Sequence, residues 1–318
     1  MQVIKKIFFY TLSILISTLV TVLLIETSVR LFVDNGFNYE IEMMKYAKNI
    51  KKVESVNGYK IFLHRPNIKT NIMRTEIKTD KNGFRYNLDN KENSNVIMLL
   101  GDSMTFGFGS SYTFADFLQE ELTGQYNILN TGVGNTNTEM QEKGFLEFHK
   151  VHDPKILVLN FFINDLEVIN PKKKNFIRNN FYSFTYLYYK YNIIKLRFSE
   201  TSTFSSYYKK TFEDEEVLLN VFNSILNLKK YSEENNIKFF IHFIPELHNL
   251  KNYPFIYEHN IIKKFLLKNR INYIDGLDYL QNKKEKTLWV SVHDTHANEK
   301  THKIIGEYLL EYLKKEIF

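Results

Sequence analysis

From about residue 95 to the C-terminus, short apolar runs alternate with amphipathic stretches. The apolar runs have the length of buried strands, and the amphipathic stretches carry apolar residues at helical spacing. This alternation is typical of a parallel sheet with helices on both faces, so we expect an α/β fold, a three-layer α/β/α sandwich around a central parallel sheet. The expected strands are 95–100, 126–130, 155–161, 237–244 and 271–275, and the expected helices lie near 113–122, 138–150, 214–235, 256–269 and 298–315.

Two of these helices also carry recognisable starts. Asp214 or Glu213 can cap the helix near 214–235, because an acidic side chain accepts hydrogen bonds from the free N–H groups of a first turn. Asn298 is a natural N-cap for the last helix. The residues just before that helix are therefore expected in a loop at the carboxyl edge of the sheet, where open parallel sheets bind ligands.

The N-terminal part of the chain has a different pattern. Ile7 to Ile25 is an uncharged, mostly apolar run, long enough to cross a bilayer as a helix. Lys5 and Lys6 precede the run and Glu26 follows it, which favours an N-terminus inside the cell. A cleaved signal peptide is the alternative, but its apolar run is normally shorter and no Ala-x-Ala-like site follows here. We expect residues 1–32 to form a cytoplasmic tip and a single-pass anchor in the cytoplasmic (inner) membrane, with the rest of the chain on the periplasmic or extracellular side.

Residues 33–94 are polar and irregular and contain two pairs that favour tight turns, Asn57-Gly58 and Asn82-Gly83. We expect this segment to be a tether followed by lead-in hairpins that cover one edge of the domain. Arg85, shortly after the second pair, is either a structural pin or a substrate contact. The structural role is favoured, because a lone arginine on a turn needs no ligand.

Residues 166–212 form an insertion within the domain that we assign to residues 95–318. Positions 172 to 210 carry nine Lys or Arg and one acid, interleaved with twelve aromatic residues. Aromatic residues usually indicate burial, which favours a helical flap packed on the domain. The alternative is a lid that contacts sugar rings or anionic lipid headgroups.

Two polar clusters far apart in the chain match a nucleophile and its base. The run Gly101-Asp102-Ser103 follows the first expected strand, so the Ser103 hydroxyl is exposed where the strand gives way to a turn. Asp294 and His296 stand just ahead of the last expected helix. These are the residue types of a nucleophile, an orienting acid and a general base. For Gly-Asp-Ser alone, the alternative is a strand-to-turn corner without chemistry, and Asp102 is expected to stabilise the turn.

At these residues the chain resembles the SGNH (GDSL-like) hydrolase family, in particular its membrane-anchored bacterial members. The resemblance assigns the nucleophile to Ser103 and the base to His296. The family's later Asn-Asp block supplies an oxyanion-hole side chain, which Asn164 matches. Its glycine-containing loop after the second strand corresponds to residues 130–138, so the amide near Gly134 or Asn135 would join the Ser103 amide in the oxyanion hole. The resemblance also implies the flavodoxin-like SGNH fold and no cofactor.

The chain departs from the family pattern at three places. The family's closing block reads Asp-x-x-His, but the residue three before His296 is His293. Asp294, two before it, is therefore the expected orienting acid. The loop glycine falls on Asn135, and asparagine tolerates left-handed backbone better than most residues. Phe162 stands where the family often has glycine.

Composition excludes several other classes of site. Cysteine is absent, which removes disulfides and thiolate metal ligands. His293, Asp294 and His296 could suggest a metal site, but no second cluster with ligand spacing accompanies them in the sequence, and we expect no metal. The net charge of +6 is modest, and no nucleic-acid-binding signature is found, so no nucleic-acid partner is expected.

These residues together predict an ester hydrolase that works by acyl transfer through Ser103, with His296 as base and Asp294 as orienting acid. The resemblance implies that the substrate is an O-acyl ester, specifically O-acetyl, on cell-envelope or secreted polysaccharide, or a small acyl ester. Two alternatives stay open. One is an O-acetyltransferase that uses the same triad with a sugar hydroxyl as acceptor, and the other is a catalytically silent carbohydrate-binding or assembly protein of the same fold.

Overall fold

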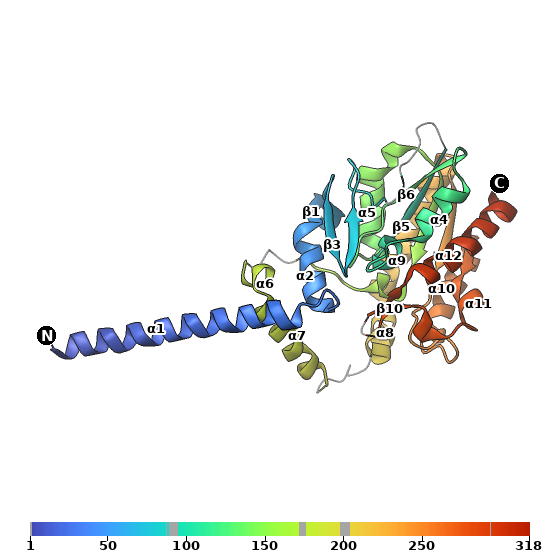
Figure 1. Cartoon of the computed structure of the whole chain (residues 1–318). Helices are drawn as coiled ribbons and strands as arrows, with labels where there is room; N and C mark the ends of the chain where they lie inside the picture. Colours follow the sequence, from blue (N-terminus) through green and yellow to red (C-terminus); the bar gives the residue numbers. More distant parts are fainter. Residues whose placement is uncertain (1, 87, 89–94, 172–175, 198–203, 293) are drawn as a thin grey trace.

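A five-stranded parallel sheet with the strand order β6-β5-β7-β8-β9 lies at the centre of the molecule (Figure 1). The computed structural model describes residues 2–86, 88, 95–171, 176–197, 204–292 and 294–318. The strands are β5 (Asn95–Gly101), β6 (Tyr126–Asn130), β7 (Pro154–Phe161), β8 (Lys238–Phe243) and β9 (Asn272–Asp275). All five expected strands are confirmed to within one or two residues at their ends.

Helices cover both faces of the sheet, as expected. Alternate residues of a strand point to opposite faces, so Ile97 and Leu99 of β5 pack in one core and Met98 and Leu100 in the other. The first core includes residues of α4 (Phe114–Glu121) and α12 (Glu299–Tyr312), and the second includes residues of α9 (Glu215–Glu234) and α10 (Ile256–Lys268). A further helix, α5 (Thr138–Gly144), contacts α9. The three-layer α/β/α sandwich is confirmed.

The expected helix caps are also present. The Asp214 carboxylate accepts from the backbone N–H groups of Glu216 and Val217 at the start of α9. The Asn298 side chain accepts from Thr301 N at the start of α12. Each such cap is worth about 1 kcal/mol, which helps fix where these helices begin.

Short elements complete the domain. They are α3 (Ser103–Phe106), η2 (Phe145–His149), η3 (Lys150–His152), η4 (Ile163–Leu166), α11 (Gly276–Leu280), η5 (Glu285–Thr287), β10 (Trp289–Ser291), β11 (Asp294–Ala297) and η6 (Leu313–Ile317). β10 and β11 pair antiparallel outside the main sheet. His296 therefore stands on a short strand rather than in the loop that we expected.

The lead-in segment is more regular than its polar pattern predicts. It contains an unpredicted helix, α2 (Tyr39–Asn49), and two hairpins. The first hairpin joins β1 (Lys51–Val56) to β2 (Tyr59–His64) through the Asn57-Gly58 turn, where both residues have positive φ, as a type I′ turn requires. This part of the expectation is confirmed.

The second hairpin turns elsewhere. It joins β3 (Lys69–Ile72) to β4 (Thr75–Lys78) through Met73 and Arg74, which carry no glycine signal but have φ of 51° and 60°. The Met73 N–H donates to the buried carboxylate of Glu42 on α2 at 2.6 Å, which helps to hold this turn. The Asn82-Gly83 pair instead makes a turn between single bridging residues.

The lead-in segment packs on the loop that follows β5. Tyr46, Ile50 and Ile72 form one buried cluster with Phe106 and Phe108. A segment that shares a core with this loop cannot move independently of it.

Arg85 is a structural pin, as favoured from the sequence. It is 3% exposed, and its guanidinium donates to the backbone oxygens of Phe106, Gly107 and Ser110, each at 2.5 Å. Its backbone also bridges Asn130 at the end of β6. Arg85 therefore ties the end of the lead-in segment to the loop after β5.

The N-terminal helix leaves the domain as a long, straight rod (Figure 1). It comprises α1 (Gln2–Ser28), continued without a break by η1 (Val29–Val33). Among the described residues it is the one helix long and apolar enough to cross a membrane, with a mean hydropathy of 2.3. A signal sequence near the N-terminus can also meet these criteria of length and hydropathy, so this helix alone is a weak indication of an anchor.

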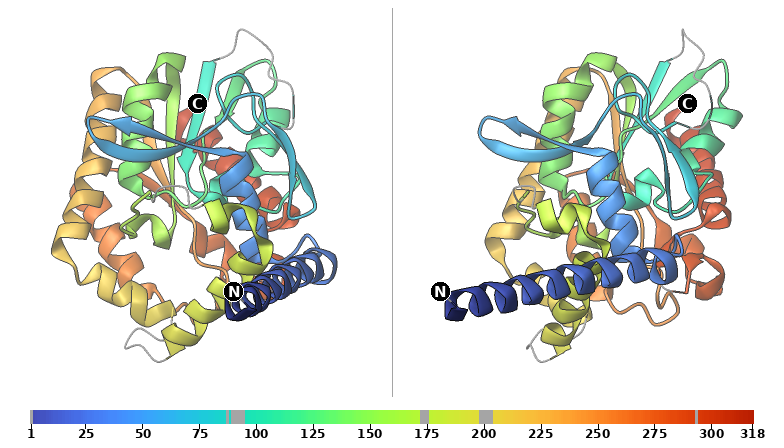
Figure 2. Two further views of the ribbon diagram at one scale, coloured as in Figure 1. Left: turned by 90° about the vertical axis from the view of Figure 1, so that its left-hand side faces the viewer. Right: turned by 60° about the vertical axis from the view of Figure 1, so that its left-hand side comes forward.

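The insertion is helical and lies beside the base of this rod (Figures 1 and 2). Its helices are α6 (Phe176–Asn180), α7 (Tyr182–Arg197) and α8 (Phe204–Phe212). Tyr208 and Phe212 are buried in the core, as expected of a packed flap. Tyr188 and Tyr191 of α7 are exposed, so packing on the domain does not account for all of its aromatic residues.

Candidate active site

The loop after β5 presents Ser103 at the carboxyl edge of the sheet. Asp102 caps the short helix α3, and its carboxylate accepts from Met104 N at 2.8 Å, which is the expected turn-stabilising role. Gly101 allows this sharp corner, since a Cβ there would lie 2.1 Å from the Thr105 hydroxyl oxygen. Ser103 as a residue is 7% exposed and lines a chamber at this edge of the sheet.

The structure brings Ser103, His296 and Asp294 together. His296 Nε2 lies 2.8 Å from Ser103 Oγ, and His296 Nδ1 lies 2.5 Å from Asp294 Oδ1. Asp294 Oδ1 also accepts the His296 backbone N–H at 3.0 Å. Since a carboxylate only accepts hydrogen bonds, Nδ1 carries the proton and Nε2 is free to accept from the serine.

Aromatic rings hold the imidazole from the other sides. The Tyr39 ring stacks on His296 with centroids 6.2 Å apart, and the Phe108 ring lies 5.2 Å away. Burial among these rings alone would lower the pKa of His296, but the charge and hydrogen bond of Asp294, with a contribution from Asp102, outweigh it and raise the pKa above its usual value. The imidazole is thus a stronger base than a free histidine.

The backbone at Asn135 has the geometry anticipated for the missing loop glycine. Its φ is +56°, in the left-handed region that asparagine tolerates, and the residue lines the chamber that contains Ser103. The neighbouring Gly134 is excluded as an amide donor to a ligand, because its N–H donates to the Tyr46 hydroxyl at 2.7 Å. Of the two loop residues considered from the sequence, Asn135 is the one that lines the chamber.

A buried relay from the lead-in segment holds the Gly134 peptide. Burial lowers the pKa of His64 to about 3, so its ring is neutral. His64 bonds to the backbone of Gly83, and its Nε2 lies 2.6 Å from the Tyr46 hydroxyl, which in turn accepts from Gly134 N. On the other side of the same residue, Lys51 Nζ donates to Gly134 O at 2.7 Å.

Asn164 lies on η4, at the carboxyl end of β7, and lines the same chamber. Its side chain hydrogen-bonds to the carboxylate of Asp102. Asp165 holds the turn, since its carboxylate accepts from Phe162 N at 3.0 Å and from the Gln141 amide at 2.8 Å. Burial, and next the charge of Asp102, raise the pKa of Asp165.

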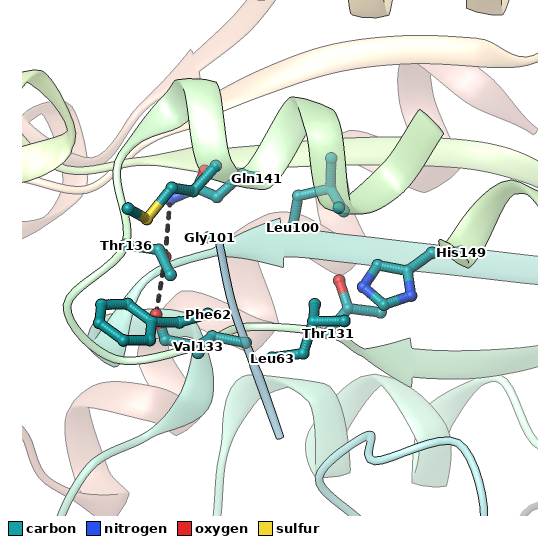
Figure 3. A pocket seen from close by; sticks show the side chains of 11 residues that line it. Phe62, Leu63, Leu100, Gly101, Thr131, Val133, Thr136, Gln141 and His149 are labelled. Carbon is teal, nitrogen blue, oxygen red and sulfur yellow. Dashed lines mark hydrogen bonds between the residues drawn. The ribbon is translucent and has the colours of Figure 1, made fainter. Parts of the chain in front are cut away.

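The chamber around Ser103 has a volume of about 660 Å³. Besides the residues already placed there, its walls include side chains that the sequence did not single out: Met43, Glu167, Tyr189, Tyr208, Glu246, His248 and Trp289. A much smaller cavity lies beside Gly101, between the end of β5, the loop after β6 and α5 (Figure 3). Its volume of about 10 Å³ is room for no more than one water molecule, so it is no substrate site.

No sequence signal marked Tyr46, Lys51 or His64 as part of the site, because they act on the backbone of Gly134 across the fold. The sequence does carry a signal for the helix α2, because the capping residue Asn38 precedes apolar residues at helical spacing. Within the described residues, no three His, Asp or Glu side chains come together as metal ligands, and His293 lies outside those residues.

A parallel sheet with a serine, a histidine and an aspartate in contact at its carboxyl edge is the arrangement of a serine hydrolase. Residues 97–309 match the model of the family described as GDSL-like Lipase/Acylhydrolase. Because the match spans more than half of the chain, the chain belongs to this family of ester hydrolases. No curated protein sequence matches it.

Solved structures with a similar fold include two esterases and a lipase/acylhydrolase. The acetyl xylan esterase AlAXEase is 18% identical, with 69% of this chain and 99% of that chain covered and a TM-score of 0.41. The lipase/acylhydrolase from Enterococcus faecalis is 12% identical, with 69% and 95% covered and a TM-score of 0.43. An acetylxylan esterase from Geobacillus stearothermophilus is 11% identical, with 68% and 93% covered and a TM-score of 0.45. The family assignment rests on the sequence match alone.

The raised pKa of His296 predicts the pH dependence of Asp294→Asn. A general base works only when neutral, so ester hydrolysis by the unaltered chain should fall as the pH drops through a pKa above 6.5. Without the Asp294 charge, the effect of burial is no longer outweighed, and the pKa of His296 should fall. The acid limb of kcat/KM should therefore move to lower pH. The maximal rate should fall about 10³- to 10⁴-fold, because the tautomer is no longer fixed.

The measurement is the pH profile of p-nitrophenyl acetate hydrolysis. Asp278→Asn, at an exposed position on α11, is the matched control and should leave the profile unchanged. An acid limb that stays in place in Asp294→Asn would show that Asp294 does not set the pKa of His296.

The relay predicts a selective defect in Tyr46→Phe. Loss of the hydroxyl leaves the Gly134 N–H and His64 Nε2 without the Tyr46 partner, which costs about 1–3 kcal/mol and loosens the loop that carries Asn135. We expect kcat to fall about 5- to 150-fold by the same energy, with KM little changed, since the loop is expected to face charge that develops in the transition state. The control is Tyr126→Phe, at the start of strand β6 and so at the end of that strand away from the Gly134 loop. Equal kinetics of the two variants would contradict the positioning role of Tyr46.

Proposed function

We propose that the chain is an SGNH-type serine esterase that hydrolyses O-acyl esters, specifically O-acetyl esters, on cell-envelope or secreted polysaccharide. The observation that carries the proposal is the chain of contacts from Asp294 through His296 to Ser103 at the rim of the chamber. The three residues in contact are of the types that serve as orienting acid, base and nucleophile, in the order that the reaction needs.

In the proposed reaction, Ser103 Oγ attacks the ester carbonyl carbon while His296 Nε2 takes the hydroxyl proton. The tetrahedral intermediate collapses, the sugar oxygen leaves with the proton from Nε2, and the acyl group stays on Ser103. Water then attacks the acyl-enzyme and gives a proton to Nε2. The second intermediate collapses, Ser103 recovers this proton from Nε2, and the carboxylic acid is released and loses its own proton to the solvent.

Three donors are proposed for the negatively charged carbonyl oxygen. They are the backbone N–H groups of Ser103 and Asn135 and the side-chain amide of Asn164, which come from three separate loops at the sheet edge. Gly134, proposed from the sequence as an alternative, is removed from this set because its N–H is bound to Tyr46. Fixed donors of this kind lower the barrier without reorganising as the charge develops.

The shape and lining of the chamber support a saccharide ester. A volume of about 660 Å³ has room for the ester and one or more sugar rings, and the aromatic side chains of Tyr39, Tyr189 and Trp289 offer flat apolar surfaces to them. The carboxylates of Glu167 and Glu246 lie in the same wall and can accept from sugar hydroxyls. We further propose that α1 is a single-pass anchor in the cytoplasmic membrane, with the esterase on the periplasmic or extracellular side.

Covalent labelling tests the proposal directly. A serine-directed fluorophosphonate should label the unaltered chain at Ser103, identified by peptide mass spectrometry, and Ser103→Ala should not be labelled. Absence of labelling at Ser103 would favour a silent carbohydrate-binding protein. Assays with an O-acetylated oligosaccharide then separate the enzymes, because an esterase releases free acetate, whereas an acyltransferase moves acetyl to an added acceptor saccharide.

The proposed oxyanion hole predicts the effect of Asn164→Ala. Loss of one donor typically raises the barrier by about 3–4 kcal/mol, so kcat for p-nitrophenyl acetate should fall about 10²- to 10³-fold. The midpoint of thermal unfolding should stay close to that of Asn220→Ala, a control on the exposed side of α9. A near-normal kcat in Asn164→Ala would remove this side chain from the hole.

A further inference from the structure

We propose that η1, α6 and α7 together form a surface that lies on the lipid bilayer. This surface, named here the interfacial surface, consists of Leu31, Phe32, Phe176, Ile177, Phe184, Leu187, Tyr188, Tyr191 and Ile194. The proposal deepens the proposed function and rests on one part of it, the membrane attachment through α1.

The first observation is that α7 is fastened to α1 by a buried carboxylate. Glu26, one residue after the apolar run, is 8% exposed and accepts hydrogen bonds from Tyr182 N and from both the backbone and the hydroxyl of Ser183. These are free groups of the first turn of α7, so Glu26 caps that helix from another element. The start of α7 is therefore fixed at the level where the apolar run of α1 ends.

Arg30 completes this junction. Its side chain pairs with Glu26 at 2.7 Å, donates to Asn180 O at 2.9 Å and lies over the Tyr182 ring at 3.9 Å. One side of α7 packs on the domain as well, because Tyr182 and Tyr186 lie against a buried cluster that includes Ile41 and Met44 of α2. The orientation of α7 relative to α1 is thus set by contacts at both helices.

The second observation is an apolar stripe on the opposite side of α7. Phe184, Leu187, Tyr188, Tyr191 and Ile194 each have another member of the group three or four residues away, and each is between 41% and 62% exposed. That spacing puts them on one face of the helix. An exposed stripe of five large apolar side chains on a helix marks a surface that another apolar phase covers.

The third observation is continuity with the candidate membrane span. Leu31 and Phe32 of η1, which continues α1, are 70% and 81% exposed, and Phe176 and Ile177 of α6 are 73% and 50% exposed. α6 and α7 lie at the side of the domain from which α1 leaves, and α7 runs across the direction of α1 (Figures 1 and 2). A helix that crosses the axis of a membrane span, close to its end, lies along the bilayer surface.

The chemistry of these helices fits a lipid headgroup region. Residues 176–197 contain no Asp or Glu, and Lys190 and Lys195 of α7 are exposed beside the stripe. Tyrosine is enriched where membrane proteins meet the headgroups, and lysines there are attracted to anionic lipids. Lipid is therefore the occupant that this surface fits, rather than another protein.

The interfacial surface would affect which substrates reach Ser103, because α7 contributes both to this surface and to the chamber. Tyr188 and Tyr191 are exposed, while Tyr189 between them lines the chamber that contains Ser103, together with Tyr39 and Met43 of α2. A bilayer under α7 would place one wall of the chamber close to the headgroups. The ester groups that reach Ser103 would then be those close to the bilayer surface on the side of the esterase domain. They would be carried by a lipid-linked saccharide or by a polymer at that surface.

Site-directed spin labelling of the full chain tests the proposal, and the absence of native cysteine makes it simple. Single variants Leu187→Cys, Tyr191→Cys, Leu15→Cys and Glu311→Cys are labelled and placed in nanodiscs of phosphatidylcholine and phosphatidylglycerol. Leu15 reports on the span, and Glu311 on α12 is an exposed control away from α7. Collision of each label with oxygen, which concentrates in lipid, is compared with collision with a water-soluble nickel chelate.

We expect the labels at residues 187 and 191 to be protected from nickel at least fivefold relative to residue 311, with residue 15 deeper still. Labels at 187 and 191 that are as accessible to nickel as residue 311, while residue 15 is in lipid, would overturn the interfacial surface and leave the anchor standing. A label at residue 15 that is in water would instead refute the anchor. Melting curves by circular dichroism confirm that each labelled variant is folded.

A charge substitution supplies an independent readout. Leu187→Glu should reduce the nickel protection at residue 191, because an acid on the stripe is repelled by phosphatidylglycerol and is costly to bury. Thr211→Glu on α8, outside the stripe, is the control. Unchanged protection in Leu187→Glu would count against lipid as the occupant.

Discussion

One contact governs the organisation of this molecule: the imidazole of His296 must reach the hydroxyl of Ser103, 193 residues earlier in the chain. A parallel sheet makes the contact possible, because all strands end at one edge and the loops after them converge. The packing of α12 against α4 returns the C-terminal part of the chain to the loop after β5. The helices and cores on both faces keep these remote residues within hydrogen-bonding distance.

The sequence carries enough information for the main sheet and for the order of the site residues. Buried parallel strands are continuous apolar runs, and capping residues such as Asp214 mark helix starts, so both can be read locally. The contacts at Gly134 could not be predicted, because whether an amide is free depends on what packs against it. The hairpin at Met73 and Arg74 escaped notice for a similar reason, since contact with α2 stabilises a turn that has no glycine.

The active site also depends on a part of the chain outside the family match. The matched region begins at residue 97, yet Tyr46 and Lys51 hold both sides of Gly134 and Arg85 holds the loop after Ser103. The lead-in segment, expected as a tether with covering hairpins, thus supports the loops that surround Ser103. Substitutions there can impair turnover without touching a substrate, because they change the position of backbone amides.

The connection between the rod and the domain has a mechanical consequence. Only residues 34–38 separate η1 from α2, and the Asp34 carboxylate accepts from Lys45 Nζ of α2 at 2.9 Å. The linker is therefore short and is held by a contact with the domain. An enzyme on a long flexible linker could reach through a thick layer of polymer. With α1 as the proposed membrane anchor, this short connection would instead hold the esterase domain at a constant height above the lipid. The proposed polysaccharide would then have to move to a stationary enzyme, and that movement would decide which ester groups are processed.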